Sequence, residues 1–258
     1  GPGMLVSPGD SLAIMLANTI VVPGYRSGVP GVARSMPTSR AVDAVAADLG
    51  IPCYETPTGW RFFSNLMENG LIGLCGEESF GTSSAHAREK DGLWAVLYWL
   101  NMLAALEQPV NDIVTRHWAR YGRCYFQRRD YFIADTDQAQ SLIGALQSSV
   151  NDLPGSALGT AANINFADEF SYTDPVNGSV SERQGIRITT SSGGRIVFRL
   201  SGTGTSGATL RVYLDKTEPK VSQQAIAPAK ALAELGLVAF KLAKIKYYTG
   251  LEEPTITI

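Results

Sequence analysis

The chain has 258 residues, 22 Lys and Arg against 24 Asp and Glu, and 45% hydrophobic residues, a composition typical of a folded globular protein of two ordinary domains or one large one. A formal net charge of −2 gives no overall field that would attract nucleic acid or an anionic membrane, so we expect neither as a partner. The longest uncharged stretches are shorter than the ~20 residues that cross a bilayer, and no secretory signal pattern is present.

Three cysteines, Cys53, Cys75 and Cys124, lie far apart in apolar segments. Their odd number and wide spacing argue against a disulfide framework or a zinc site. The sequence offers two histidines, His86 and His117, as nitrogen ligands for a metal ion. We therefore expect reduced, buried thiols, a cytoplasmic location and no metal site in this chain.

Strands and helices alternate over residues 1–121. The apolar pattern predicts helices over 11–21, 39–50, 60–70, 91–108 and 109–122, and strands over 32–36, 51–57 and 71–76. We expect Pro23 to stop the first helix, and Ser39 to start the second. Short connections between alternating elements favour an α/β domain over 1–121, with a mixed, largely parallel sheet, helices on both faces and functional loops at the carboxyl ends of the strands.

The pattern changes at Gly122, where we place a domain boundary. A predicted strand and an amphipathic helix are followed by a strand-rich region with turn signals at Asn177-Gly178 and Gly193-Gly194. The segment 225–250 predicts one amphipathic helix packed on a sheet. We expect 122–258 to form an α+β domain with an antiparallel sheet.

The acidic motif GEESFGTSSAH directly follows an apolar strand. Neighbouring side chains on an extended backbone point to opposite sides, so Glu77 and Glu78 do not make a matched pair of acid and base. One carboxylate and the Ser79 hydroxyl are suited to gripping vicinal hydroxyls, although a solvated polar loop is the commoner fate of such a motif. Thr58 and Gly59 end the preceding strand and can line a pocket, start a helix, or do both.

The motif RLSGTGTSGATLRVY begins at Arg199. Strand alternation turns Arg199 and Arg211 away from the core face, so both can converge at the mouth of the loop. The glycines and hydroxyl residues between them offer backbone N–H groups and hydroxyls, which beside forked guanidinium groups are typical of a phosphate-binding nest. The motif lacks the ending of a nucleotide-binding P-loop. A plain glycine-rich hairpin is the alternative.

Other charged side chains are weaker candidates. Lys90 is placed to pair with an anionic substrate or to donate a proton, but a solvated lysine is commoner. His86 is a candidate proton shuttle, but a hydrogen-bonded loop histidine is more usual. Arg128 and Arg129 are neighbours on one predicted strand, so one of them can face a cleft while the other faces solvent, and the sequence does not decide which.

Five segments together resemble phosphoglucomutases of the α-D-phosphohexomutase superfamily. They are TPTGW at 56–60, GEESFG at 76–81, REKDGLWAVL at 88–97, DPVNGSVSERQGIR at 174–187 and RLSGTGTSGATLRVY at 199–213. Relatives that act on mannose or glucosamine phosphates have methionine or glutamine where Glu78 stands. In this family a four-domain enzyme moves a phosphoryl group between the 1 and 6 hydroxyls of glucose through glucose 1,6-bisphosphate, with Mg²⁺.

The resemblance implies that 1–121 is the third, sugar-binding domain and 122–258 the fourth, phosphate-binding domain. It implies substrate contacts for Thr58, Gly59, Glu77, Ser79, Lys90, Arg199, Ser201, Gly202, Thr203, Gly204 and Arg211. Lys90 matches an active-site lysine near the group that is transferred, and His86 is the second candidate for a catalytic role.

Two family motifs do not occur in these 258 residues: the TASHN-type motif of the phosphorylated serine and the DGDGDR magnesium loop. Phosphoryl transfer needs the nucleophile, the cation and substrate positioning together. The resemblance therefore implies that the isolated chain is inactive, that its partners are glucose phosphates and the missing N-terminal domains, and that the Mg²⁺ ligands lie outside it. Two alternatives stay open, a non-catalytic scaffold of the same family and a mutase for another hexose phosphate.

Overall fold

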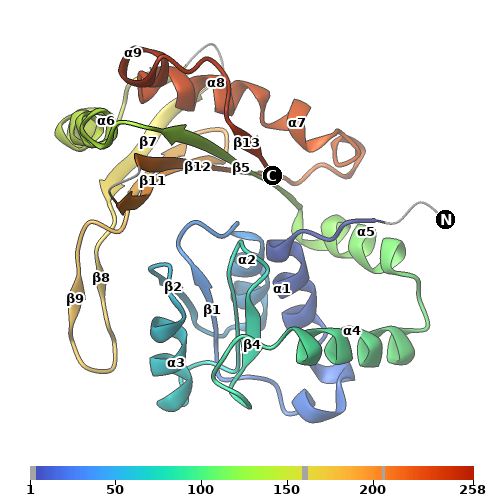
Figure 1. Ribbon diagram of the computed structural model, residues 1–258. Helices are drawn as coiled ribbons and strands as arrows, with labels where there is room; N and C mark the ends of the chain where they lie inside the picture. Colours follow the sequence, from blue (N-terminus) through green and yellow to red (C-terminus); the bar gives the residue numbers. More distant parts are fainter. Residues whose placement is uncertain (1–3, 159–161, 205–206) are drawn as a thin grey trace. The chain divides into compact units, whose positions relative to one another are not determined.

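The computed structural model describes residues 4–158, 162–204 and 207–258, without the side chains at 158, 203 and 204. Contacts divide the chain into two compact units (Figure 1). The first unit runs to Cys124 and also takes in Thr173–Val180 and Glu218–Ala225. The second consists of Tyr125–Tyr172, Ser181–Thr217 and Ile226–Ile258. Two segments from the second half of the chain therefore fold with the first unit.

The first unit is built on a four-stranded sheet in the order β2-β1-β3-β4. Its strands are β1 (Val32–Ser35), β2 (Cys53–Thr56), β3 (Leu74–Gly76) and β4 (Thr82–Ser84), and its helices are α1 (Pro8–Ala17), α2 (Ala41–Leu49), α3 (Trp60–Glu68), α4 (Gly92–Leu106) and α5 (Val110–Tyr121). Strand β1 pairs in parallel with β2 and β3, and β4 runs antiparallel to β3. This confirms the predicted mixed, largely parallel sheet.

Helices cover both faces of this sheet because adjacent residues of β1 enter different cores. Val32 packs in a cluster with α1, α2 and α5, whereas Ala33 packs in a second cluster with Phe63 and Leu66 of α3. Successive side chains of a strand point to opposite faces, and all four residues of β1 are buried, so the strand is covered on both sides. The α/β architecture of the first unit is thus confirmed.

Two predicted helix boundaries were wrong. Helix α1 ends at Ala17, well before Pro23, because the Asn18 side chain donates a hydrogen bond to the Ile14 carbonyl, 2.8 Å away, in the last turn. Helix α2 begins at Ala41, and Ser39 does not cap it. The Ser39 hydroxyl faces Gly9 of α1 instead, where an added Cβ would lie 1.9 Å from Ser39 Oγ. A glycine at position 9 therefore lets α1 and the start of α2 pack closely.

The second unit contains a seven-stranded sheet in the order β13-β5-β12-β11-β10-β7-β6. Its strands are β5 (Arg123–Ile133), β6 (Ala157–Leu158), β7 (Ala162–Glu169), β10 (Ile186–Thr190), β11 (Gly194–Gly204), β12 (Gly207–Glu218) and β13 (Ile256–Thr257). Antiparallel pairs join β13 to β5, and join β12, β11, β10, β7 and β6 in turn. A separate pair, β8 (Tyr172–Thr173) and β9 (Val180–Ser181), flanks the predicted Asn177-Gly178 turn. The antiparallel α+β expectation is confirmed.

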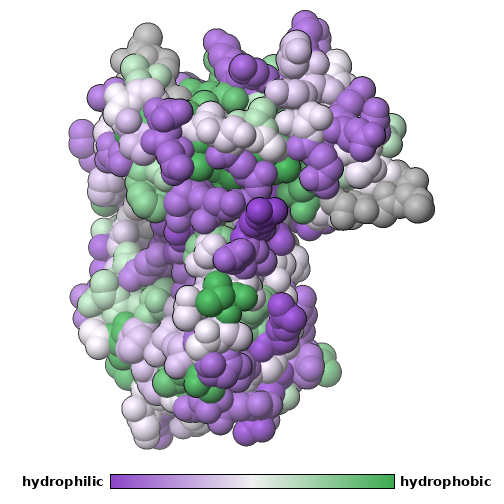
Figure 2. Space-filling model, turned by 90° about the vertical axis from the view of Figure 1, so that its left-hand side faces the viewer, coloured by the Kyte–Doolittle hydropathy of each residue, from purple (hydrophilic) through white to green (hydrophobic). Residues whose placement is uncertain are grey.

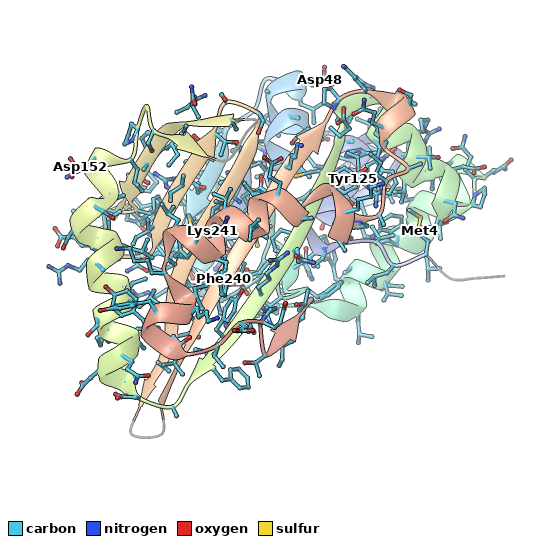
Figure 3. The ribbon with its side chains drawn as sticks, turned by 90° about the horizontal axis from the view of Figure 1, so that it is seen from above. Met4, Asp48, Tyr125, Asp152, Phe240 and Lys241 are labelled. Carbon is cyan, nitrogen blue, oxygen red and sulfur yellow. The ribbon has the colours of Figure 1, made fainter. Side chains whose placement is uncertain are left out.

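Helices pack on one face of this sheet (Figure 3). They are α6 (Thr136–Ser149), α7 (Pro228–Ala231), α8 (Ala233–Leu242) and α9 (Ile245–Thr249). Elsewhere in the described chain, short 3-10 turns lie at Thr19–Val21, Pro23–Tyr25, Val150–Asp152 and Val221–Gln223. The predicted single helix over 225–250 was wrong, because the chain leaves helical geometry at Leu232 and at Lys244, which has φ 47°. A straight helix of that length would extend about 39 Å, whereas the bent path lets Leu232 and Ile245 both reach the buried core.

Hydrophilic side chains predominate on the face shown in Figure 2. Within the described ranges, no helix is both long and apolar enough to cross a membrane.

Candidate functional site

The acidic loop follows β3 and places Glu77 in a buried ion pair. Its carboxylate is 3% exposed, and Oε2 lies 2.7 Å from Nζ of Lys90. The backbone N–H of Gly59 donates to Oε1 at 3.4 Å. A buried carboxylate is costly unless it is paired and hydrogen-bonded, so Lys90 and Gly59 together make this position tolerable. Three predicted site residues from three different segments are thereby brought into contact.

Glycine at position 81 is what lets Lys90 reach Glu77. A Cβ at Gly81 would lie 3.0 Å from Glu77 Oε2 and 3.0 Å from Lys90 Cε. The Lys90 side chain is about half exposed, and its Nζ lies 5.5 Å from the centre of the Trp60 ring, a cation–π contact. The ammonium is therefore held between a buried carboxylate and an aromatic face, with one side open to solvent.

Glu78 has different partners from its neighbour, as the extended backbone predicted. The Ser35 hydroxyl, at the end of β1, donates to Glu78 Oε2 at 3.1 Å and also lies 2.7 Å from the Thr38 hydroxyl. Glu78 is buried. It therefore ties the acidic loop to the carboxyl end of β1 and does not meet Glu77 as a matched acid and base pair.

Two predicted sugar-contacting hydroxyls differ in their surroundings. The Thr58 hydroxyl is buried and, within the described part of the chain, accepts or donates no hydrogen bond, whereas Ser79 is exposed. Buried polar atoms in native proteins almost always have partners, so the unpaired Thr58 hydroxyl is an exception that keeps its hydrogen-bonding capacity unused. Gly59, with φ 134°, begins α3 next to it, a conformation that suits glycine.

The basic hairpin sets its two arginines directly opposite each other. Arg199 of β11 pairs with Arg211 of β12 in the antiparallel register. Ile196, Phe198, Leu210 and Val212 enter the buried core, so alternation puts both arginines on the other face, as predicted. Like charges directly opposite on neighbouring strands destabilise a sheet. An anion between the two guanidinium groups would relieve that repulsion.

Neither arginine is fully neutralised by its neighbours in the described structure. Arg199 donates to the Gln184 carbonyl at 3.3 Å and to the Tyr213 hydroxyl at 3.4 Å, both uncharged acceptors. Arg211 Nε lies 4.0 Å from Asp130 Oδ2 and, among the described residues, is a buried donor without a hydrogen bond. Asp130 is shared with Arg128, at 2.9 Å. The hairpin thus carries a net positive charge with a free donor.

The rest of the predicted nest is partly described. Ser201 pairs with Thr209, and a register shift follows between Ser201 and Gly204, with Gly202 at φ 68°. The side chain of Thr203 and residues 205–206 lie outside the described residues. The positive φ at Gly202 is a conformation that lets backbone N–H groups face an anion.

His86 lies on the segment between β4 and α4 that also carries Lys90. Its Nδ1 is 2.5 Å from Ser84 Oγ, and its Nε2 is 3.1 Å from Asp91 Oδ2. The Trp94 backbone N–H and His86 lower the pKa of the Asp91 carboxyl. The roles of Ser84 and Asp91 were not predicted. The one sequence signal for Asp91 was its place before an apolar run, which is typical of a helix cap.

Two of the three thiols are buried, as the sequence predicts. Cys75 and Cys124 are buried, whereas Cys53 is half-buried, and none of the three forms a disulfide. Burial raises the pKa of the Cys53 thiol to about 12 and raises that of Cys75 well above its usual value. Neither of these two thiols is therefore an activated nucleophile.

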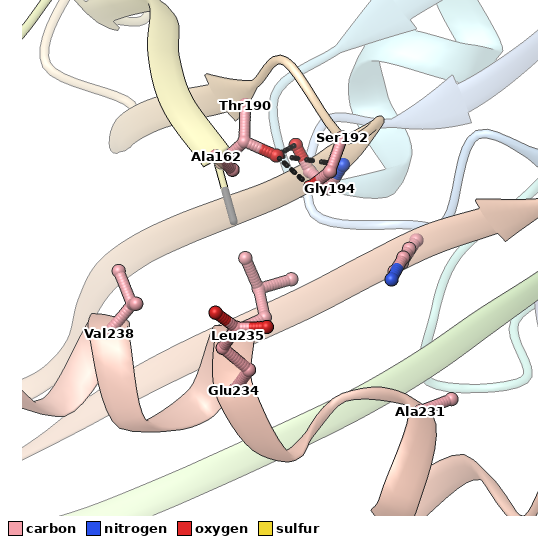
Figure 4. A pocket seen from close by; sticks show the side chains of 9 residues that line it. Ala162, Thr190, Ser192, Gly194, Ala231, Glu234, Leu235 and Val238 are labelled. Atoms are coloured by element: carbon pink, nitrogen blue, oxygen red, sulfur yellow. Dashed lines mark hydrogen bonds between the residues drawn. The ribbon is translucent and has the colours of Figure 1, made fainter. Parts of the chain in front are cut away.

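The described residues form no cluster of metal ligands. In the described residues, no three His, Cys, Asp or Glu side chains lie together as metal ligands, so they do not fit a magnesium ion and we derive no step through one. The small hollow in Figure 4, between the β10–β11 turn and α8, contains none of the predicted site residues. Its Thr190 hydroxyl already bonds Ser192 and the Gly194 N–H.

Comparison with known proteins places both halves of the chain in one family. Residues 8–121 match the model of phosphoglucomutase/phosphomannomutase alpha/beta/alpha domain III, and residues 123–255 match that of the phosphoglucomutase-1 C-terminal domain. A phosphoglucomutase from Rhizobium radiobacter is 55% identical over 256 residues, and a probable cytoplasmic phosphoglucomutase from Arabidopsis thaliana is 48% identical over 273. Each alignment covers 99% of this chain and 47% of the relative.

Solved structures agree. The exocytosis-sensitive phosphoprotein pp63/parafusin, a phosphoglucomutase from Paramecium in its open form, superimposes with a TM-score of 0.90 at 44% identity, over 99% of this chain and 44% of that one. A phosphoglucomutase/phosphomannomutase family protein from Burkholderia thailandensis, at 14% identity and a TM-score of 0.61 over 98% of this chain and 44% of that one, shares the fold. The chain spans about half the length of the curated relatives it matches, and it belongs to the phosphoglucomutase family, in which it corresponds to domain III and the C-terminal domain.

Proposed function

We propose that the chain is the glucose-binding and phosphate-binding part of a phosphoglucomutase that interconverts glucose 1-phosphate and glucose 6-phosphate through glucose 1,6-bisphosphate. The domain assignment of this proposal is 1–121 for sugar recognition and 122–258 for phosphate recognition. Cytoplasmic phosphoglucomutases are among the similar proteins, and we propose the same location here.

The observation that carries the proposal is the arginine pair of the basic hairpin. Arg199 and Arg211 stand directly opposite each other in the strand register, and Arg211 keeps a buried donor without a hydrogen bond in the described structure. A phosphate dianion would accept forked hydrogen bonds from both, with the neighbouring Ser201 and Gly202 supplying further donors. We assign to this hairpin, with Thr203 and Gly204, the phosphate that is not being transferred.

The acidic loop supports the sugar half of the proposal. The Glu77 carboxylate and the exposed Ser79 hydroxyl would hold sugar hydroxyls, and Thr58 and Gly59 would orient the ring. A sugar hydroxyl is a donor and an acceptor, so it can satisfy both a carboxylate and an unpaired threonine hydroxyl. Lys90, already close to Glu77, would face the anionic group that is transferred.

Catalysis by the isolated chain is not part of the proposal. The phosphoserine and magnesium motifs of the family do not occur in the sequence, and Mg²⁺ would supply charge neutralisation for phosphoryl transfer only from ligands elsewhere. We therefore propose that the N-terminal domains of the same enzyme are its partner. We expect no Mg²⁺-dependent turnover by the pure chain in a coupled assay, and measurable turnover would contradict this.

Calorimetric titration with glucose 6-phosphate at low salt tests the phosphate assignment. Arg211→Ala is expected to weaken binding at least about tenfold, since a hydrogen bond to a charged group is worth ~1.5–3 kcal/mol. The control is Arg187→Ala, because Arg187 lies on the neighbouring strand β10 but forms a salt bridge with Asp168 at 2.5 Å. Unchanged affinity in Arg211→Ala, or equal losses in both variants, would remove the hairpin from the phosphate site.

A second candidate function is a non-catalytic scaffold of the same family. The likeness to the Paramecium exocytosis-sensitive phosphoprotein pp63/parafusin favours it. A scaffold has no need of an unneutralised arginine pair, so loss of binding in Arg211→Ala would favour the enzyme.

A further inference from the structure

A closed set of hydrogen bonds surrounds the segment that carries Lys90. Trp94 Nε1 donates to the Tyr25 hydroxyl at 2.8 Å, which lies 2.6 Å from Ser84 Oγ. Ser84 Oγ lies 2.5 Å from His86 Nδ1, and His86 Nε2 lies 3.1 Å from Asp91 Oδ2. Asp91 in turn accepts from the Trp94 backbone N–H at 2.9 Å. We call these five residues the Trp94–Asp91 ring.

The chemistry of the two ends fixes the direction of every proton in the ring. An indole N–H can only donate, so the Tyr25 oxygen accepts from Trp94 and its single proton goes to Ser84. An ionised carboxylate can only accept, so His86 donates to Asp91 through Nε2–H. In a neutral imidazole the other nitrogen, Nδ1, is then an acceptor, and the Ser84 hydroxyl must donate to it. Both ends give the same order: Trp94 donates twice, Tyr25, Ser84 and His86 donate once each, and Asp91 only accepts.

This ring fastens the segment 85–91 at both of its ends. Ser84 immediately precedes the segment, and Asp91 is its last residue. The Asp91 backbone N–H also donates to the Thr82 carbonyl of β4 at 3.1 Å. The His86 ring stacks on Trp94, with centroids 5.5 Å apart. From the other side, Trp60 Nε1 donates to the Arg88 carbonyl at 3.0 Å. The backbone that carries Lys90 is thus held from β4, α4 and α3.

We infer that His86 is a positioning residue: as the neutral Nε2–H tautomer it links Ser84 to Asp91 and so fixes the segment from which Lys90 reaches Glu77. Both of its ring nitrogens are engaged in the ring, so this role stands in place of the predicted proton shuttle. That the positioned lysine meets a phosphoryl group rests on the proposed function. The tautomer and the fastening of the segment do not, and they are tested separately.

Nitrogen-15 NMR of the labelled chain at pH 8 tests the tautomer. The sequence has two histidines, and the His86 signals are assigned by their loss in His86→Gln. We expect one pyrrole-type nitrogen, Nε2, and one pyridine-type nitrogen, Nδ1, without averaging between two forms. In Ser84→Ala the Nδ1 signal should move, because its donor is gone. An Nδ1–H tautomer, an average of the two forms, or an imidazolium in the wild-type chain would overturn the inference.

Amide hydrogen exchange tests the fastening, with adjacent buried serines as a matched pair. Ser84→Ala removes a ring member, whereas Ser83→Ala removes a hydroxyl that donates to the Ser84 carbonyl at 3.4 Å. We expect the amides of 85–91 to exchange about fivefold faster in Ser84→Ala, the effect of one lost hydrogen bond on local opening, and to stay within about twofold in Ser83→Ala. Equal exchange in the two variants would refute the fastening, whatever the chain binds.

Discussion

The Glu77–Lys90 ion pair is expected to respond unequally to loss of its two partners. Lys90 is 51% exposed and Glu77 is 3% exposed, with 2.7 Å between the charged atoms. Leaving a buried charge without its partner costs about 3–5 kcal/mol. In Lys90→Met the carboxylate keeps the Gly59 N–H, so we expect a loss of unfolding free energy at the low end, about 3 kcal/mol.

Glu77→Gln removes the same ion pair from the other side. The amide that replaces the carboxylate carries no charge to bury, and the half-exposed ammonium of Lys90 can turn to water. Replacing a buried ionic group by a neutral one of similar size is often close to neutral. We therefore expect the free energy of unfolding to change by no more than about 1 kcal/mol.

Urea unfolding followed by tryptophan fluorescence at pH 7 measures both variants. All four tryptophans lie in the first unit, so the signal reports the unit that contains the ion pair. Lys220→Met is the control, because Lys220 is an exposed lysine of the same unit, and it should change stability by less than about 0.5 kcal/mol. Equal destabilisation by Lys90→Met and Glu77→Gln would refute the asymmetry.

Three further perturbations test the packing that positions the two loops. Desolvation raises the pKa of the Asp10 carboxyl from 3.8 to about 6, so the folded chain loses stability as the pH rises between these values. In urea titrations, Asp10→Asn should raise the free energy of unfolding by up to about 3 kcal/mol at pH 8 and leave it unchanged below pH 3.8. Arg34 is buried and forms salt bridges with Asp43 and Glu55 at 2.6 and 2.8 Å. Arg34→Met should therefore lower the free energy of unfolding by about 3–5 kcal/mol. A smaller loss of stability in thermal unfolding than that of a surface-arginine control would contradict this. Gly207 has φ 103°, and an added Cβ would lie 2.6 Å from a β5 carbonyl oxygen. Gly207→Ala should therefore lower the melting temperature of the second unit, measured by calorimetry. An unchanged transition would contradict that strand geometry.

Local patterns were enough to predict the fold class. Apolar segments of strand and helix length alternate before Gly122, and this alone favours a parallel sheet with helices on both faces. The Asn177-Gly178 and Gly193-Gly194 turns likewise followed from the conformations that glycine and asparagine adopt. The terminal helix could not be predicted in detail, because its breaks at Leu232 and Lys244 let it pack on a core formed by strands that lie outside the segment.

Contacts between distant segments explain what sequence reasoning missed in the site. Tyr25 and Ser84 are 59 positions apart, and nothing in either local pattern signals that they share a hydrogen bond. Glu77 was predicted to grip sugar hydroxyls together with Ser79, and that prediction did not include its burial or its pairing with Lys90, both of which depend on the absence of a side chain at Gly81. The opposition of Arg199 and Arg211, in contrast, follows directly from strand alternation and the length of the loop.

Binding of two ligands to one pair of variants tests the central claim most directly, namely that the acidic loop recognises the sugar and the basic hairpin recognises the phosphate. Glucose 6-phosphate affinity should fall in both Glu77→Gln and Arg211→Ala, whereas inorganic phosphate affinity should fall only in Arg211→Ala. If Glu77→Gln binds glucose 6-phosphate as tightly as the unaltered chain does, the account of sugar recognition is wrong.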